Sequence, residues 1–174
     1  MAVVTSLASG EHRAREPGRA LPDGAHRGSS KEPSQGSFLE VEPDEKERVL
    51  LVKAIRAPVD VVLPEGCAVL NAEDPEIATM SVKCRGKIVY FARDAEAELV
   101  REHLDKGGQA ISLAGDTIVV RHIAQLVPIL EVEHLHAPIA SLLAAVGAGV
   151  ALGLTQSIIR DGITAALQRE SATS

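Results

Sequence analysis

Aromatic side chains are nearly absent from this sequence: its 174 residues include no tryptophan, one tyrosine and two phenylalanines. Modules that stack nucleic-acid bases need several aromatic platforms, so this shortage argues against such a module. A formal net charge of −6 likewise argues against a protein that binds a phosphate backbone. We therefore expect no nucleic-acid partner. Because 45% of the residues are still hydrophobic, we expect a core of aliphatic side chains.

Cysteine is also scarce. Cys67 and Cys84 have no neighbouring cysteine or histidine at the spacing of a zinc site. The pattern predicts neither a disulfide framework nor a structural zinc ion, and it suits a reducing cytoplasm. Both cysteines fall within apolar patterns, so we expect them in the core rather than in catalysis.

Signals for export or membrane insertion are missing as well. No basic region precedes the short apolar run at the amino terminus, as it would in a secretory signal. The longest apolar stretch, residues 137–154, is rich in alanine and glycine and has no flanking lysine or arginine. We expect it to form a helix buried against a sheet, in a cytoplasmic protein without a membrane partner.

The composition divides the chain into three parts. Glycine, proline, serine and charged residues recur without apolar periodicity near the amino terminus, which predicts a disordered leader over residues 1–44. Residues 45–168 have the patterns of an α/β domain, and residues 169–174 form a short flexible tail.

Within this domain, strands and helices alternate before a hairpin. The apolar runs 59–63 and 67–70 are separated by a turn, and Asp74 with Pro75 predicts a capped helix start. Gly115 and Asp116 separate two strand-like runs, as in a hairpin. The pattern indicates an α/β fold with a sheet that is partly parallel and partly antiparallel and has flanking helices. The expected helices are 45–55, 75–86, 94–106, 138–152 and 155–168, and the expected strands are 67–70, 87–92, 109–114, 117–122 and 125–132.

Strong catalytic motifs are not found. Gly86-Lys87 resembles the end of a phosphate loop, but Ser81 stands where that motif needs glycine and Ile88 where it needs serine or threonine. The sequence also contains no GxGxxG, GxSxG or HExxH motif, so we assign no catalytic residue.

Two clusters remain as candidate sites. His134 and His136 would share one face of a strand and could bind a metal, but no further ligands are specified nearby, so two solvated or hydrogen-bonded histidines are preferred and no metal is predicted. Asn71, Glu73 and Asp74 follow an expected parallel strand, at the edge where open α/β sheets bind ligands. These three residues are our candidates for a nucleotide or substrate cleft. A turn with a helix cap is the structural alternative, and spacing alone favours it.

The stretch PVDVVLPEGCAVLNAEDP, residues 58–75, resembles the Mur-ligase-like module of cyanophycin synthetases. The similarity continues through CRGKIVYFA at 84–92 and, more weakly, to about residue 167. The resemblance implies part of a Mur-ligase central domain, in a lineage of ATP-dependent amide ligases. These ligases phosphorylate a carboxylate with Mg-ATP and then let an amine attack it. In cyanophycin synthetases the Mur-like module adds arginine to aspartate side chains.

The resemblance also implies what this sequence lacks. The family has a phosphate loop before the matched stretch, and this sequence has no such motif there. The resemblance also implies two nucleotide-holding asparagines just before the family's Leu-Ala-Ala helix, and Pro138 and Ser141 align with them in this sequence. We therefore expect a truncated ligase domain that is inactive alone and that works with a complementary ligase half. The alternative is a non-catalytic binding or assembly module, possible as a homo-oligomer, that associates through a sheet edge and apolar faces, including the small-residue face of the helix at 139–153.

Overall fold

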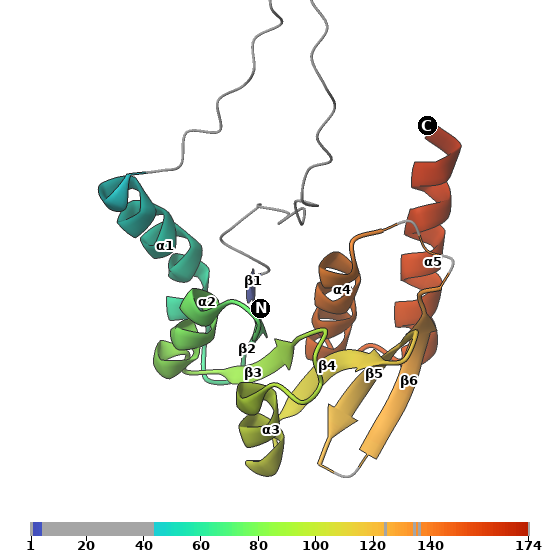
Figure 1. The fold of residues 1–174 in the computed structure, drawn as a ribbon, viewed down its shortest axis with the longest axis horizontal. Helices are drawn as coiled ribbons and strands as arrows, with labels where there is room; N and C mark the ends of the chain where they lie inside the picture. Colours follow the sequence, from blue (N-terminus) through green and yellow to red (C-terminus); the bar gives the residue numbers. More distant parts are fainter. Residues whose placement is uncertain (1, 5–43, 124, 134, 136, 174) are drawn as a thin grey trace, which may run out of the picture.

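One six-stranded sheet forms the centre of the computed structural model, which describes residues 2–4, 44–123, 125–133, 135 and 137–173. The strands lie side by side in the order in which they occur in the sequence, from β1 to β6 (Figure 1). The first four strands are mutually parallel, and the last three pair antiparallel. The predicted α/β class and mixed sheet are confirmed. The strands are β1 (Ala2–Val4), β2 (Cys67–Asn71), β3 (Lys87–Phe91), β4 (Gln109–Ala114), β5 (Thr117–His122) and β6 (Gln125–Glu131).

Helices cover both faces of this sheet. In Figure 1, α4 and α5 lie together on one side of the strands and α3 lies on the other. Among the described residues, none of the helices combines the length and the hydropathy that a membrane-spanning segment requires. The helices are α1 (Glu45–Asp60), α2 (Pro75–Thr79), the 3-10 helix η1 (Met80–Lys83), α3 (Glu98–Asp105), α4 (Ile139–Ala151) and α5 (Gln156–Thr173).

The core has two main parts because β2 and β3 are buried on both faces. Val69 and Phe91 pack in one cluster with α4, whereas Leu70 and Tyr90 pack in a second with α1 and α2. Continuous apolar strands of this kind are typical of a parallel sheet covered on two sides. The apolar run at 87–92 is therefore the signal that places β3 at the centre.

Helix α4 lies close to the sheet because glycine faces it. A Cβ atom added at Gly147 would lie 2.7 Å from Cγ1 of Val69, and one added at Gly149 would lie 2.6 Å from Cγ1 of Ile159 on α5. This face also includes Ala144, which is 4% exposed. Gly147 and Ala144 of the expected small-residue face are therefore covered by the protein's own core, and association through the rest of that face stays a prediction.

The start of α1 is fixed by a capping box. The Asp44 side chain accepts a hydrogen bond from Glu47 N at 2.8 Å, and the Glu47 carboxylate accepts one from Asp44 N at 3.2 Å. The helix then continues through Pro58 to Asp60. The apolar run 59–63 is therefore the end of a helix and the loop after it, not a separate extended segment.

Both ends of the predicted domain differ from expectation. Residues 2–4 were assigned to a disordered leader, but they form β1 and pair parallel with β2, with Val3 opposite Val69. Residues 1 and 5–43 lie outside the described part of the chain. At the other end, α5 continues to Thr173, through most of the predicted tail.

Two predicted helices are shorter than expected. The helix expected at 75–86 ends at Thr79 and continues as the 3-10 turn η1, and the helix expected at 94–106 begins only at Glu98. Gly107, at φ +82°, and Gly115, at φ +60°, take the left-handed conformations that the predicted helix end and hairpin turn require.

Candidate ligand-binding edge of the sheet

The carboxyl ends of β2 and β3 lie next to each other. Asn71 is opposite Phe91 in the parallel register, and Ala72 N donates to Phe91 O at 2.9 Å. The chain leaves each strand through a short loop and enters a helix, α2 after β2 and α3 after β3. This edge is where α/β sheets bind ligands. Asn71 is the last residue of β2, and Glu73 and Asp74 lie on the loop that follows it.

Asn71 closes the turn that follows β2. Its side chain is nearly buried, with the residue 7% exposed, and its Oδ1 accepts a hydrogen bond from Glu73 N at 3.0 Å. A side-chain amide that bonds the backbone two residues later mimics a turn. Asn71 therefore shapes the loop from within the sheet.

Glu73 joins the loop after β2 to the loop after β3. Its Oε1 accepts hydrogen bonds from Arg93 N at 2.6 Å and from Asp94 N at 3.3 Å. A carboxylate is a strong acceptor for backbone N–H groups, because the bond is charge-assisted. Sequence spacing could not reveal this contact, because its partners are twenty residues apart.

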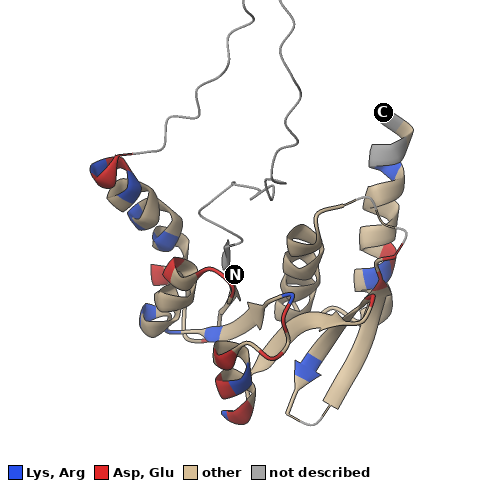
Figure 2. Ribbon diagram, in the orientation of Figure 1, with Lys and Arg blue, Asp and Glu red and all other residues tan. Residues whose placement is uncertain are grey.

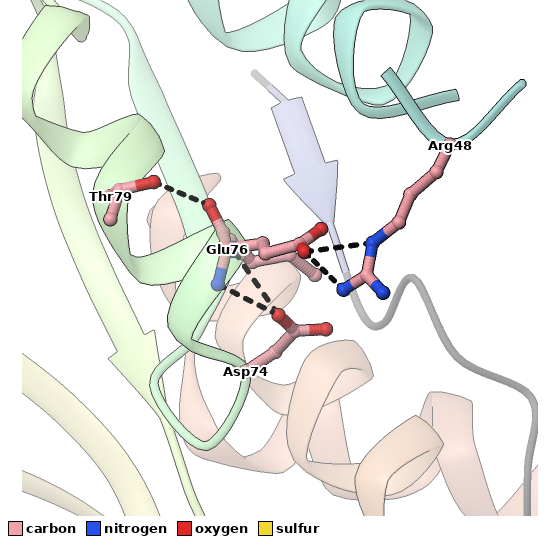
Figure 3. Close-up of polar contacts among 5 residues, drawn as sticks. Arg48, Asp74, Glu76 and Thr79 are labelled. Carbon is pink, nitrogen blue, oxygen red and sulfur yellow. Dashed lines mark hydrogen bonds and ion pairs between the residues drawn. The ribbon is translucent and has the colours of Figure 1, made fainter. Parts of the chain in front are cut away.

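Asp74 caps α2. Its Oδ1 accepts hydrogen bonds from Glu76 N at 3.0 Å and Ile77 N at 3.3 Å (Figure 3). Figure 3 also shows the Arg48 guanidinium of α1 paired with the Glu76 carboxylate, and Thr79 Oγ1 donating to Glu76 O at 2.7 Å. The cap and Pro75 explain why a helix begins here, as the sequence predicted.

The structure thus brings the three candidate residues together, and each one binds backbone N–H groups. The turn and the helix cap of the structural alternative are both formed. These structural roles are compatible with a cleft lined by the same side chains. Each role also accounts for the presence of its residue without any ligand.

Carboxylates dominate the charge at this edge. The loops 71–75 and 92–97 contain Glu73, Asp74, Asp94 and Glu96 but only one cation, Arg93. Figure 2 shows acidic residues along both connections. A second cation reaches the edge from β5, where Arg121 Nη1 lies 3.3 Å from Ala95 O and 3.4 Å from the Glu96 carboxylate. Carboxylates can bind Mg²⁺, but this set of residues does not fit a triphosphate, whose charge needs cations and free amides around it.

The remaining candidate groups give no metal centre within the described residues. No three His, Cys, Asp or Glu side chains gather there into a possible metal site. His134 and His136 lie outside the described part, so the preference for solvated histidines is untested. Cys67 is buried and Cys84 is half-buried, and both are free thiols. Burial raises the pKa of the Cys67 thiol, which makes it a weak nucleophile.

The protein therefore belongs to the α/β class. Helices cover both faces of its mixed sheet, and carboxylates gather where the parallel strands β2 and β3 end. Cyanophycin synthetases are the proteins that the chain matches. It is 32% identical to the cyanophycin synthetase of Synechocystis sp. over 128 residues, or 69% of the chain. It is 51% identical to that of Nostoc sp. over 49 residues, or 28% of the chain, and 38% identical to that of Crocosphaera subtropica over 64 residues, or 37%. No protein-family model matches the chain.

The resemblance predicted from residues 58–75 is therefore confirmed: the chain is cyanophycin-synthetase-like. The match covers only a small part of each relative, 14% of the Synechocystis protein, 5% of the Nostoc protein and 7% of the Crocosphaera protein.

Proposed function

We propose that this chain is part of a Mur-ligase-like, ATP-dependent amide ligase of the cyanophycin synthetase lineage. The observation that supports this most is the match to the Synechocystis cyanophycin synthetase, at 32% identity over 128 residues. Within the proposal, Asn71, Glu73 and Asp74 line the edge of the sheet where nucleotide or substrate binds.

The reaction of such a ligase has two steps. The γ-phosphoryl group of Mg-ATP passes to a carboxylate, which leaves ADP and an acyl phosphate. An amine then attacks the acyl carbon, an amide bond forms and phosphate leaves. In the cyanophycin case the carboxylate belongs to an aspartate side chain and the amine to arginine.

We further propose that the chain does not catalyse this reaction alone. Even with Arg121 beside them, the four carboxylates and one arginine of the two loops at the carboxyl edge would repel a triphosphate rather than bind it. Stabilising the transferred phosphoryl group needs cations and amide donors directed at its oxygens. In this proposal a complementary ligase half supplies the cations and amide donors, and this chain supplies the carboxylates of the two loops. Such a ligase would work in the cytoplasm, where ATP is available and thiols such as Cys67 stay reduced.

A chimaera tests both parts of the proposal. The aligned part of this chain, 69% of its length, replaces the matched segment of the Synechocystis cyanophycin synthetase, and arginine-dependent ADP release is measured with an aspartate polymer. We expect the chimaera to release ADP and the isolated chain to release none. A folded chimaera without activity would contradict the lineage, and ADP release by the isolated chain would contradict its inactivity.

The second candidate function is a non-catalytic assembly module, and exposed apolar side chains favour it. On α1, Leu50 is 64% exposed, and beyond the helix Val61 and Leu63 are 72% and 60% exposed. Leu50 and Ala54, four residues apart, share one exposed face of α1, and Val61 follows directly where the helix ends. Exposed apolar surfaces of this kind mark places where a protein contacts a partner, and a second copy of the chain is the partner tested here.

The two edge strands of the sheet are less suited to pairing with another chain than the sequence analysis predicted. Pro128 interrupts the outer strand β6, because proline cannot donate a backbone hydrogen bond, and β1 is only three residues long. Light scattering on the wild type and on Leu50→Lys tests the assembly. A dimer that becomes a monomer on substitution supports it, and a wild-type monomer at high concentration contradicts it.

A further inference from the structure

A cavity of about 860 Å³ lies at the opposite edge of the sheet from Asn71. It is formed where β2, β3 and β4 begin and where α3 and α4 end. None of the three candidate residues of the carboxyl edge lines it. The cavity is therefore a separate feature, and its role does not depend on the proposed ligase lineage.

One wall of the cavity is apolar. Val150, Ala151 and Leu152 supply it from the end of α4, and Cys67 and Val89 supply it from the sheet. Leu152 is 61% exposed, so part of this apolar surface is open to a ligand. An alkyl chain of a few carbons would bury this surface, and the favourable free energy of binding would increase with the apolar area removed from water.

The charged groups of the cavity are mainly cationic. Lys87 at the start of β3 and Lys106 after α3 both line it, whereas Glu65 is its one acidic residue. Lys87 pairs with Cys67 in the parallel register, so it lies beside the apolar wall. Lys106 pairs with Glu102 at 3.3 Å, but its side chain is 75% exposed, and such a surface pair holds the ammonium only weakly.

The carbonyl groups at the two helix ends beside the cavity are largely engaged in backbone hydrogen bonds. Free carbonyls at a helix end favour positive charge, yet here backbone groups bind many of them. Gly107 N and Gly108 N donate to Leu104 O and His103 O at the end of α3, and Gly153 N and Leu154 N donate to Val150 O and Gly149 O at the end of α4. Both ends are therefore closed in the manner of Schellman caps.

His103 forms a neutral part of the wall. Its Nε2 lies 3.1 Å from Ile88 O, and its ring stacks edge-on against Tyr90 with ring centroids 4.9 Å apart. His122, at the end of β5, is the second histidine of the lining, and the two lysines carry the positive charge that selects a ligand.

We propose that this cavity binds a small amphipathic carboxylate. Its alkyl chain lies on the α4 wall beside Val150 and Leu152, and its carboxylate lies at Lys87, with Lys106 as the second cation.

Three probes with the same six-carbon chain test this proposal: hexanoate, hexan-1-ol and hexylammonium. Each is titrated into the ¹⁵N-labelled full chain while the amide signals of Gly107, Gly108 and Gly153 are followed by NMR. We expect hexanoate to shift these signals and to bind more tightly than the alcohol, and hexylammonium to bind most weakly. Lys87→Gln should weaken hexanoate binding about two- to fivefold, as for other partly exposed charge contacts. The matched control is Lys83→Gln, which removes a lysine of η1 outside the cavity and should change nothing.

Three outcomes would overturn the proposal. Hexylammonium or hexan-1-ol could bind as tightly as hexanoate, which would remove the selection for negative charge. Lys87→Gln could bind hexanoate as the wild type does. The shifts could also occur away from the three glycines, which would place the ligand elsewhere. This experiment measures binding at the edge of the sheet where β2, β3 and β4 begin. A negative result would therefore not affect the chimaera experiment, and a negative chimaera result would not affect this proposal.

Discussion

The Glu73 carboxylate accepts a 2.6 Å hydrogen bond from the backbone N–H of Arg93. This contact ties together the two loops that leave neighbouring parallel strands, β2 and β3. The candidate edge is therefore held in shape by one of the residues that sequence reasoning had proposed to bind a ligand there.

Replacing Glu73 tests this structural role. Glu73→Ala removes the acceptor of two backbone N–H groups, but both lie at exposed residues where water can replace it. We therefore expect a loss of about 1 kcal/mol in the free energy of unfolding, measured in urea. Hydrogen exchange of the Arg93 and Asp94 amides should become faster. Glu73→Gln keeps an acceptor oxygen and should lose less, and equal effects of both variants would contradict the account.

The Asp74 cap gives a second prediction. Asp74→Ala leaves the first N–H groups of α2 without their side-chain acceptor and should lower the free energy of unfolding by about 0.5–2 kcal/mol. Asp74→Asn keeps an oxygen at the same place and should retain most of the stability. If the alanine variant unfolded at the same urea concentration as the wild type, the cap would have no energetic role.

Alanine substitutions at Gly147 in α4 and at Gly162 in α5 should change the stability of the protein in opposite directions. At Gly147 an added methyl group would lie 2.7 Å from Val69 Cγ1, so Gly147→Ala should cost about 1–3 kcal/mol through overpacking. At Gly162, inside α5, nothing lies within 4 Å, so Gly162→Ala should stabilise the protein by up to about 1 kcal/mol. Thermal unfolding of both variants compares them, and a stable Gly147→Ala protein would contradict the packing of α4 on β2.

His103 predicts a pH dependence of stability. Burial lowers the pKa of this imidazole, and its hydrogen bonds to the Ile88 and Gln109 backbone oppose the shift without reversing it. The nearby Lys106 also lowers this pKa. The unfolded chain therefore binds a proton at higher pH than the folded protein does. Stability from this group is complete above a pH of about 6.5 and is lost as the pH falls toward the folded pKa.

Urea unfolding at pH 7.5 and at pH 5.5 measures this effect. The wild type should lose more stability between the two values than His103→Gln, whose amide can still donate to Ile88 O but does not titrate. Equal losses in the two proteins would show that His103 does not titrate differently in the folded and unfolded states.

Local sequence signals predicted the central part of the fold. The apolar run 87–92 predicted β3, Gly115 and Asp116 predicted the hairpin turn, and Asp74 with Pro75 predicted the start of α2. Each of these features depends on residues close together in the sequence, so propensity and turn chemistry were enough. The candidate residues at 71–74 could be placed at the sheet edge for the same reason.

Features that depend on distant contacts could not be predicted. Strand β1 exists through pairing with β2, more than sixty residues later, and three residues have no pattern of their own. The end of α1 includes Pro58, which normally argues against a helix, yet Val59 is fully buried and holds the last turn against the core. The Glu73–Arg93 contact and the cavity at the amino edge also arise only when separate strands meet.

Isothermal calorimetry with Mg-ATP on the isolated chain tests the central claim most directly. The acidic loops at the carboxyl edge predict no binding in the micromolar range, because four carboxylates outnumber Arg93 and the neighbouring Arg121 there. Micromolar binding that is lost on Asn71→Ala, in a variant that remains folded, would contradict the account and would show a complete nucleotide site.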